Sequence, residues 1–365
     1  MKIYKSIFLY CLIPLFTIIL LNSCNDDDEP NNNPPENKGT YVPDDNFEQK
    51  LIDLGYDNVL DDYVKTHIIR DVVELDVSDS EIKDLTGIED FRSLETLDCG
   101  WNQLTSLDVS NSVSLEVLDC GWNQLTSIDI SSNTSLKYLH FDKNQLTNLD
   151  ISNNPSLVWL DCDTNQLTSL DVSKNISLEH LTCYNNQLSS LDVSNNTSLR
   201  SLRCNNNQLT SLGVSNNTSL VGLYCHENQL TSLDVSNNIL LTELTCQRNQ
   251  LTTLDISNNI SLTGLWCGYN QLTNLDVSNN TSLVQLWCQE NQLTSLDVTK
   301  HTSLGELNCY GNQLTSLDVS NNTSLEYLKC QTNPLTCVKV NQTQLDDIPE
   351  YWEKDPEDTY SLDCN

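Results

Sequence analysis

The stretch LVQLWCQENQLTSLDVT, residues 283–299, decides the fold because it recurs with changes along most of the chain. Twelve units repeat with a period of 21 residues. They begin at Leu94, Leu115, Leu136, Leu157, Leu178, Leu199, Leu220, Leu241, Leu262, Leu283, Leu304 and Leu325. A fixed period of this length is typical of a solenoid, in which each unit buries its apolar face against its neighbours.

The segment LxxLxC of each unit predicts a short strand. In the quoted unit, Leu286 and Cys288 lie two residues apart, so they share one face of the strand while Trp287 faces the other way. Parallel stacking of such strands about 4.8 Å apart gives a continuous sheet with an apolar interior. We expect the second segment, LxxLDV, to form another short extended stretch on the opposite wall.

The unit LxxLxCxxNQLTSLDVSNNTS resembles the leucine-rich repeat, in the 21-residue form found in bacterial surface proteins, over about residues 72–340. The stretch LDVSDSEIKDLTGIEDFRSL resembles the 22-residue repeats of internalin-type proteins. The resemblance implies a mainly β, right-handed leucine-rich-repeat solenoid of short parallel strands. We expect a divergent first repeat at residues 72–93 and regular repeats at residues 94–333.

Positions that hardly vary among the units are those that stacking requires. One asparagine occupies all twelve units, as expected for an inward amide that bonds to turn backbone. Cysteine fills eleven of the twelve positions of another column, from Cys99 to Cys330, and Phe141 fills the remaining one. Because phenylalanine cannot replace a nucleophile or a metal ligand, we interpret this column as apolar filling.

Aspartate occupies ten of the twelve positions in a third column. Neighbouring carboxylates about 5 Å apart repel one another by about 1 kcal/mol in water, so the column needs compensation. Each carboxylate could accept backbone N–H groups of the following turn. The alternative is bound Ca²⁺, which prefers oxygen ligands, with Asp255, Asp276 and Asp297 as candidate ligands. The sequence leaves both interpretations open and predicts no other cofactor.

Both ends of the repeat region change character, as caps of a solenoid must. The stretch VPDDNFEQKLIDLGYD predicts a short amphipathic helix with Phe47, Leu51 and Leu54 on its apolar face and Gly55 at its end. We expect this N-terminal cap to span residues 41–71.

A C-terminal cap is expected at residues 334–365, where the regular pattern ends. Cys337 and Cys364 lie there, outside the cysteine column. In an exported protein they predict a disulfide that closes the cap. A pair of free thiols is the alternative.

The chain has 365 residues and a formal net charge of −33, because 51 acidic residues stand against only 18 basic ones. So acidic a surface excludes nucleic acid as a partner. Cationic partners, divalent metal ions and neutral glycans remain compatible with this charge.

Residues 1–23 have the pattern of a signal peptide, with Lys2 and Lys5 before an apolar run that is too short for a transmembrane helix. The sequence LNSC that ends at Cys24 resembles the lipobox of bacterial lipoproteins, which implies cleavage before Cys24 and lipidation of that residue. The alternative is an ordinary secretory signal with an incidental cysteine.

Residues 24–40 predict a disordered tether, because they contain acids, asparagine and proline but no apolar side chain for a core. The acidic run behind Cys24 also resembles the signals that export some lipoproteins to the outer face of the outer membrane. We therefore expect a lipid-anchored protein of the bacterial outer membrane that faces the cell exterior. A linker that only improves solubility is the alternative.

Aromatic residues are concentrated at the outward positions of the strands and the turns that follow them. The leading patch contains Tyr224, Trp266, Tyr269, Trp287 and Tyr310. A second patch contains Tyr138, Trp159, His180 and Tyr184. A general strand preference for aromatic residues would not favour one side, yet the LDV segments lack them. Flat rings flanked by Asp, Asn and Gln suit sugar rings or the apolar anchors of a protein partner.

The sequence contains no motif for catalysis. HExxH, GxSxG and phosphate-binding glycine loops are absent, and the five histidines are scattered. We expect a monomeric, non-catalytic surface protein that binds a protein or carbohydrate ligand through the aromatic patches. The alternative is a structural or adhesive rod whose aspartate column binds Ca²⁺.

Overall fold

The computed structural model describes residues 39–364, which belong to one compact unit. The predicted signal peptide, the predicted lipidation site at Cys24 and nearly all of the predicted tether lie outside the described residues. Within residues 39–364, no helix combines the length and the apolar character needed to cross a membrane.

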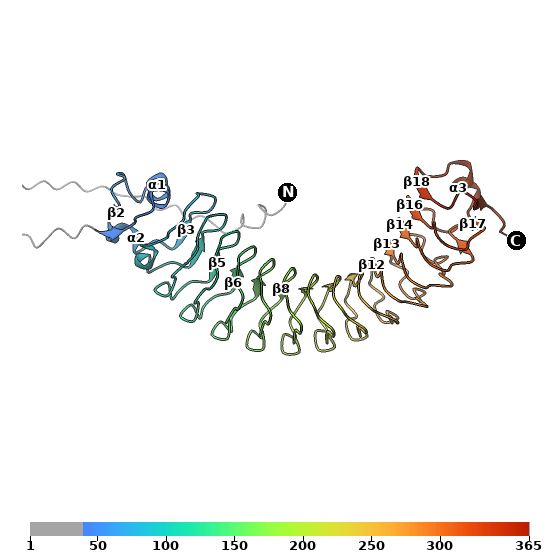
Figure 1. The fold of residues 1–365 in the computed structure, drawn as a ribbon, viewed down its shortest axis with the longest axis horizontal. Helices are drawn as coiled ribbons and strands as arrows, with labels where there is room; N and C mark the ends of the chain where they lie inside the picture. The colour runs from blue at the N-terminus through green and yellow to red at the C-terminus, as the bar shows by residue number, and fades with distance from the viewer. Residues whose placement is uncertain (1–38, 365) are drawn as a thin grey trace, which may run out of the picture. The chain divides into compact units, whose positions relative to one another are not determined.

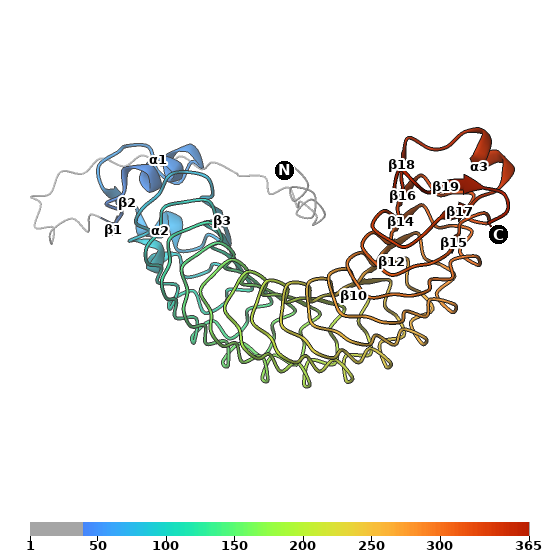
Figure 2. The same cartoon turned by 45° about the vertical axis from the view of Figure 1, so that its right-hand side comes forward.

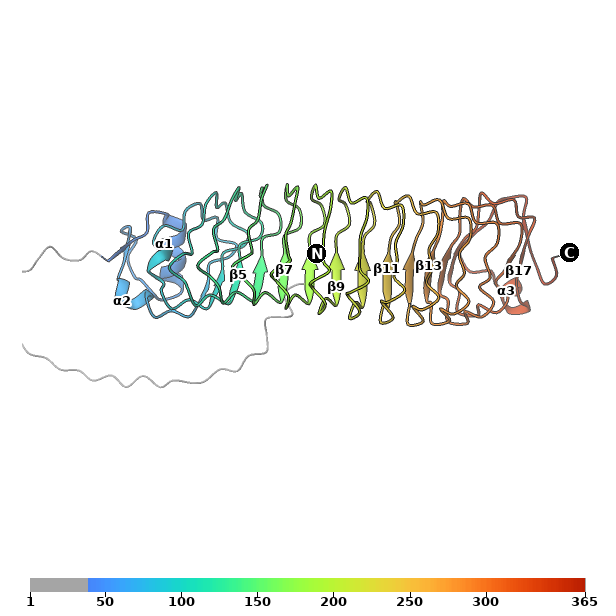
Figure 3. The same cartoon turned by 90° about the horizontal axis from the view of Figure 1, so that it is seen from below.

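Fourteen short strands form one parallel sheet, and each strand pairs with the strand of the adjacent turn (Figure 1). The strands are β3 (Glu74–Asp76), β4 (Thr96–Asp98), β5 (Val117–Asp119), β6 (Tyr138–His140), β7 (Trp159–Asp161), β8 (His180–Thr182), β9 (Ser201–Arg203), β10 (Gly222–Tyr224), β11 (Glu243–Thr245), β12 (Gly264–Trp266), β13 (Gln285–Trp287), β14 (Glu306–Asn308), β16 (Tyr327–Lys329) and β18 (Tyr351–Glu353). Figure 2 shows these strands along the inner side of a curved stack, and Figure 3 shows them side by side. The predicted solenoid of parallel strands is confirmed.

The cysteine column lies entirely inside the solenoid. Its eleven side chains are fully buried, and so is Phe141, which takes the place of a cysteine in β6's turn. Burial raises the pKa of the Cys288 thiol to about 12, because the thiolate would lose its hydration. These thiols are therefore protonated and inaccessible, as the interpretation of the column as apolar filling requires.

The invariant asparagine of each unit holds neighbouring turns together. In a central unit, the Asn207 amide nitrogen donates to the carbonyl oxygens of Cys183 at 3.0 Å and Cys204 at 3.1 Å. Its Oδ1 accepts from the backbone N–H of Leu188 at 2.9 Å. Each such amide thus satisfies backbone groups of two successive turns that the strands leave unpaired.

A second buried asparagine column lies opposite the first, and it was not singled out in the sequence. Its members are Asn133, Asn154, Asn175, Asn196, Asn217, Asn238, Asn259, Asn280 and Asn322, and His301 takes one position. The Asn217 amide nitrogen, for example, donates to the carbonyl oxygens of Val193 at 2.9 Å and Asn196 at 2.8 Å. These side chains connect turns on the wall that faces away from the large sheet.

The expected second extended wall forms a sheet only near its C-terminal end. There β15 (Leu317–Asp318), β17 (Cys337–Lys339) and β19 (Thr359–Ser361) pair in parallel. Elsewhere the LDV segments form one isolated bridge, between Asp108 and Asp129. Because the strands line the inner side of the curve, the opposite segments are spaced more widely, and asparagine side chains replace direct backbone pairing (Figure 2).

The N-terminal cap contains β1 (Thr40–Tyr41), α1 (Asp45–Asp53), β2 (Tyr63–Val64) and α2 (Thr66–Ile69), and the 3₁₀ helix η1 (Ile88–Asp90) follows in the divergent first repeat. The Asp44 carboxylate caps α1 by accepting backbone N–H groups of Asn46 and Phe47. Phe47 and Leu51 are fully buried, as predicted.

Leu54, in contrast, is 43% exposed, so its assignment to the apolar face of the helix was wrong. Glu48 is the side chain that this face buries instead. Its carboxylate accepts the backbone N–H groups of Asp61, Asp62 and Tyr63, which hold the following loop against the helix. Leu54 does not share this buried face because α1 ends at Asp53, one residue before it.

The C-terminal cap has the backbone arrangement of a repeat although its sequence does not follow the repeat pattern. β18 continues the large sheet, and Trp352 lies where the repeats place a leucine, opposite Leu328. In α3 (Gln342–Asp346), the Gln344 amide donates to the carbonyl oxygens of Val319 and Asn322, as an asparagine of the second column would. Cys337 and Cys364 form the predicted disulfide, with their Cα atoms 5.7 Å apart.

Candidate ligand-binding face

All nine predicted ligand-binding residues lie in the strands of the large sheet or in the turns that follow them. Tyr138 and Tyr269 are the most exposed of them, at 41% and 40%. The other seven are half-buried, so their rings lie partly against the sheet and partly in solvent. A face with half-buried rings offers apolar area at a low cost in side-chain entropy.

Two of these rings lie flat on the sheet because a glycine precedes them by two residues. A Cβ atom at Gly264 would stand 2.4 Å from the Trp266 ring, and one at Gly222 would stand 2.9 Å from the Tyr224 ring. No larger residue would leave room for the rings in these orientations. Glycine at these two strand positions therefore exists to accommodate the aromatic residue beside it.

Trp266 and Trp287 lie opposite each other in adjacent strands, as the repeat predicts. Their rings do not stack on each other. Trp287 instead stacks with Tyr327, with 6.1 Å between ring centroids, and its indole N–H donates to Glu306 at 3.1 Å. Trp266 is held by Gly264, so the two indoles present separate surfaces.

In the second predicted patch, Trp159 stacks on His180 with 4.4 Å between the ring centroids. His140 lies on the other side of Trp159, at 6.1 Å. The rings at the N-terminal rim, Trp101 and Trp122, form a separate stacked pair at 3.8 Å.

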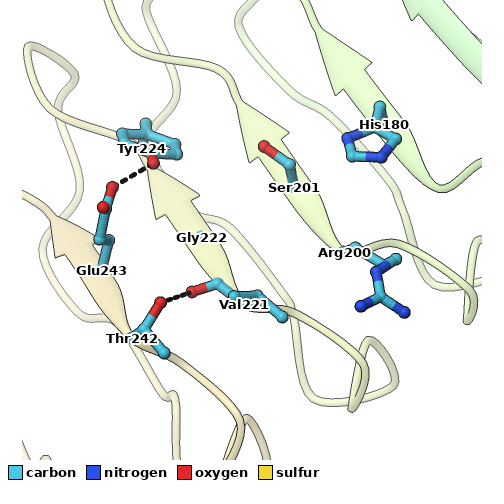
Figure 4. Close-up of a pocket in the computed structure, with 8 residues that line it drawn as sticks. All are labelled: His180, Arg200, Ser201, Val221, Gly222, Tyr224, Thr242 and Glu243. Atoms are coloured by element: carbon cyan, nitrogen blue, oxygen red, sulfur yellow. Dashed lines mark hydrogen bonds between the residues drawn. The ribbon is translucent and has the colours of Figure 1, made fainter. Parts of the chain in front are cut away.

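A depression with a volume of about 260 Å³ brings the two predicted patches together at the middle of the sheet. We call it the Gly222 depression; it is lined by His180, Arg200, Ser201, Gly222, Tyr224 and Glu243, with Val221 and Thr242 completing it. Figure 4 shows Arg200, His180 and Ser201 on one side and Tyr224 with Glu243 on the other. The Tyr224 hydroxyl donates a short hydrogen bond to the Glu243 carboxylate.

A second depression, of about 250 Å³, lies nearer the C-terminal cap and contains two residues of the leading patch, Tyr269 and Tyr310. Amide and charged side chains complete it: Gln289, Asn308, Lys329, Gln331 and Glu353. The Oε1 atoms of Gln289 and Gln331 are buried and accept no hydrogen bond from residues 39–364. Trp266 and Trp287 line neither depression.

Several lining residues were missed in the sequence, above all Arg200. It belongs to the column one residue before each strand, which was not predicted from the sequence to be part of the outward face. The available signal was its charge: an arginine among the Glu, Lys, Val and Thr residues of that column in a strongly acidic chain.

The aspartate column caps turns. Backbone N–H groups two residues further on donate to the three candidate calcium ligands: Ser257 to Asp255 at 3.0 Å, Ser278 to Asp276 at 2.9 Å, and Thr299 to Asp297 at 3.0 Å. These hydrogen bonds and those from the hydroxyls of the same residues, of which the Thr299 hydroxyl has the largest effect on Asp297, lower the pKa of each carboxyl because they favour the ionised form. Residues 39–364 contain no group of three or more His, Cys, Asp or Glu side chains placed to hold a metal ion.

A different set of acidic residues, on the sheet face, has raised pKa values instead of lowered ones. Asp98 and Asp119 are opposite each other in β4 and β5, and Asp142 follows in the next turn. Burial, followed by neighbouring carboxylates, raises the pKa of Asp98 to about 6 and that of Asp142 to about 7. The same causes raise the pKa of Asp161.

These raised pKa values predict that the protein is more stable at pH 5 than at pH 8. A carboxyl with a folded-state pKa above its unfolded value stabilises the fold when protonated, and that contribution is lost as pH rises through about 6 to 7. The urea concentration at the midpoint of unfolding should therefore be lower at pH 8 than at pH 5. Asp142→Asn should reduce this difference and raise the midpoint at pH 8, whereas Asp171→Asn, at an exposed turn cap, should leave the difference unchanged. An equal or higher midpoint at pH 8 for the unmodified protein would contradict this.

No protein-family model matches the chain, and no curated protein matches it in sequence. Solved structures do match. The functional domain of InlJ from Listeria monocytogenes, described as including a cysteine ladder, is 37% identical with a TM-score of 0.80; the match covers 88% of this chain and 69% of that one.

Two further solved structures share the fold. An internalin, InlF, from Listeria monocytogenes is 24% identical with a TM-score of 0.74, over 89% of this chain and 97% of that one. YopM from Yersinia enterocolitica is 26% identical with a TM-score of 0.60, over 80% of this chain and 69% of that one.

Proposed function

The chain belongs to the internalin-type leucine-rich-repeat proteins, and we propose that it is a non-catalytic, lipid-anchored binding protein of the bacterial cell surface. Its ligand is a protein partner bound on the inner face of the solenoid. Solenoids of stacked repeats use extended concave surfaces of this kind for binding.

One observation carries this proposal: the variable aromatic side chains gather on the inner sheet face, whereas the constant Leu, Cys and Asn columns are buried. A scaffold without a ligand would require only the constant columns. The half-buried rings of Trp266 and Trp287 lie in adjacent strands of this face and have the character of the aromatic anchors that dominate protein interfaces. Anchoring through Cys24 would display this face to the cell exterior.

The test replaces Trp266 and Trp287 together by alanine and measures binding to a surface-protein array and then to each captured protein in isolation. We expect at least a tenfold loss of affinity, because aromatic anchors at an interface centre contribute about 2 kcal/mol or more each. The matched control replaces a different pair of tryptophans on the solenoid, the stacked Trp101 and Trp122, by alanine and should change affinity by less than about threefold.

Far-UV circular dichroism must show that both variants keep the fold. Unchanged binding by a folded Trp266→Ala/Trp287→Ala variant would refute the aromatic face as the binding surface. That result would favour the alternative of a structural rod.

A further inference from the structure

The Gly222 depression contains a cation without a partner. Arg200 is exposed and makes no hydrogen bond or ion pair with another side chain of residues 39–364. Two other cations on the sheet side of the solenoid are paired, Lys137 with Glu116 at 2.8 Å and Lys329 with Glu353 at 3.4 Å. In a chain with a net charge of −33, an unpaired guanidinium beside a depression is available to an anionic group of a ligand.

His180 lies on the same side of the depression and adds a neutral hydrogen-bonding group (Figure 4). Burial lowers the pKa of His180, and the nearby charges of Arg200 and Arg203 lower it further, against the opposing effect of Glu179. The imidazole is therefore neutral at pH 7, with one N–H donor. Its stacking on Trp159 holds the ring in place.

The opposite side of the depression suits hydroxyl groups rather than a second anion. The Glu243 carboxylate accepts the Tyr224 hydroxyl and has further acceptor capacity, but it would repel a negative charge. The Ser201 hydroxyl points into the space between the two sides and has no hydrogen-bond partner within residues 39–364 (Figure 4). The Thr242 hydroxyl donates to the Val221 carbonyl at 3.2 Å and can still accept.

The size of the depression limits the ligand. Its volume of about 260 Å³ is below the range of about 300–1,000 Å³ typical of sites for drug-sized molecules. The Tyr224 ring over Gly222 provides an apolar edge against which one small ring can pack. An acidic amino-acid side chain would pair with the Arg200 cation, but it would leave the Ser201 hydroxyl without a partner and would offer no hydroxyl donor to the remaining acceptor positions of Glu243.

We propose that the Gly222 depression binds a single acidic sugar residue, with its carboxylate between Arg200 and His180 and its hydroxyls toward Ser201 and Glu243. This inference rests on the proposed function, since the sugar is carried by the partner that the sheet face binds. It assigns the depression a ligand class that the aromatic anchors alone do not specify.

The test titrates the purified full chain with N-acetylneuraminic acid and with glucuronic acid, and observes binding by saturation-transfer NMR and calorimetry at pH 7. Glucose and N-acetylglucosamine serve as uncharged sugars, and N-acetylglutamate as a carboxylate without a sugar ring. We expect one or both acidic sugars to bind at least tenfold more tightly than the other three probes.

Arg200→Met should weaken binding of the acidic sugar at least tenfold, and Arg200→Lys should retain part of it. Arg92→Met is the matched control, because Arg92 is an exposed arginine in the N-terminal cap, paired with Asp90 at 3.2 Å. It should leave sugar binding unchanged. Since Arg200 is exposed, circular dichroism should show intact folding in every variant.

Three outcomes would overturn the proposal: no binding of either acidic sugar, equal binding of the uncharged sugars or N-acetylglutamate, or unchanged binding by Arg200→Met. The protein-array measurement with the Trp266 and Trp287 variant is independent of these probes. Partner binding that survives Arg200→Met but not the tryptophan replacements would leave the proposed function standing while this inference fails.

Discussion

Replacing Asn207 by alanine is expected to lower the free energy of unfolding by about 2–4 kcal/mol, because a buried polar group left without a partner costs about 1–3 kcal/mol and each further hydrogen bond lost costs about 0.5–1.5 kcal/mol. The substitution would leave the N–H of Leu188 without a partner. It would also remove one of the two hydrogen bonds that the carbonyl oxygens of Cys183 and Cys204 each accept, while those from Asn186 and Asn228 remain. The loss is large because one side chain serves two turns in the middle of the stack.

Urea denaturation followed by circular dichroism would measure this effect. The matched control is Gln208→Ala, in which the next residue along the chain is exposed and its side chain makes no hydrogen bond within residues 39–364. That variant should change stability by less than about 0.5 kcal/mol. Similar midpoints for the two variants would mean that the asparagine column does not hold the turns together.

The second large effect is expected on removal of the disulfide between Cys337 and Cys364. The bridge spans a sequence separation of 27 residues, and closing a loop of that length stabilises a fold by about 3–4 kcal/mol in the chain-entropy model. The replacement Cys337→Ser/Cys364→Ser should therefore loosen the C-terminal cap first. Trp352, only 7% exposed and packed at the end of the sheet, should then report unfolding by its fluorescence.

A reducing agent provides the control for this prediction. The eleven other cysteines within residues 39–364 are buried free thiols, so reduction of the intact protein should reproduce the double replacement and should not affect the variant itself. A fluorescence midpoint that is the same with and without reductant in the unmodified protein would show that the bridge contributes little to the cap.

Comparison of the repeats with one another made most of the fold predictable. Where a column is constant, such as the asparagine at 207, its burial follows from the need of every turn for the same contact. The tolerance of Phe141 in the cysteine column indicates from the sequence alone that the column is apolar filling, and all its members are buried. The bridge between Cys337 and Cys364 followed from their place outside the column.

Features without repetition were harder to predict. Leu54 was predicted on the buried face of a helix that ends one residue earlier. The helix occurs only once in the chain, so its end could not be found by comparing repeats. The return of β18 to the large sheet was missed because Trp352 and Gln344 perform the tasks of leucine and asparagine with different side chains.

The sequence by itself determined the solenoid and the residues that build it. Stacking requires the same residue types at the same positions every 21 residues, so the requirement is visible in each unit. It also located the aromatic residues on one face. Only the tertiary structure decided which of them meet: it separated Trp266 from Trp287, paired Trp159 with His180, and joined His180, Arg200 and Tyr224 around Gly222. Such groupings depend on side-chain directions and on the space left by a glycine two residues before an aromatic ring, and neither repeats in every unit of the chain.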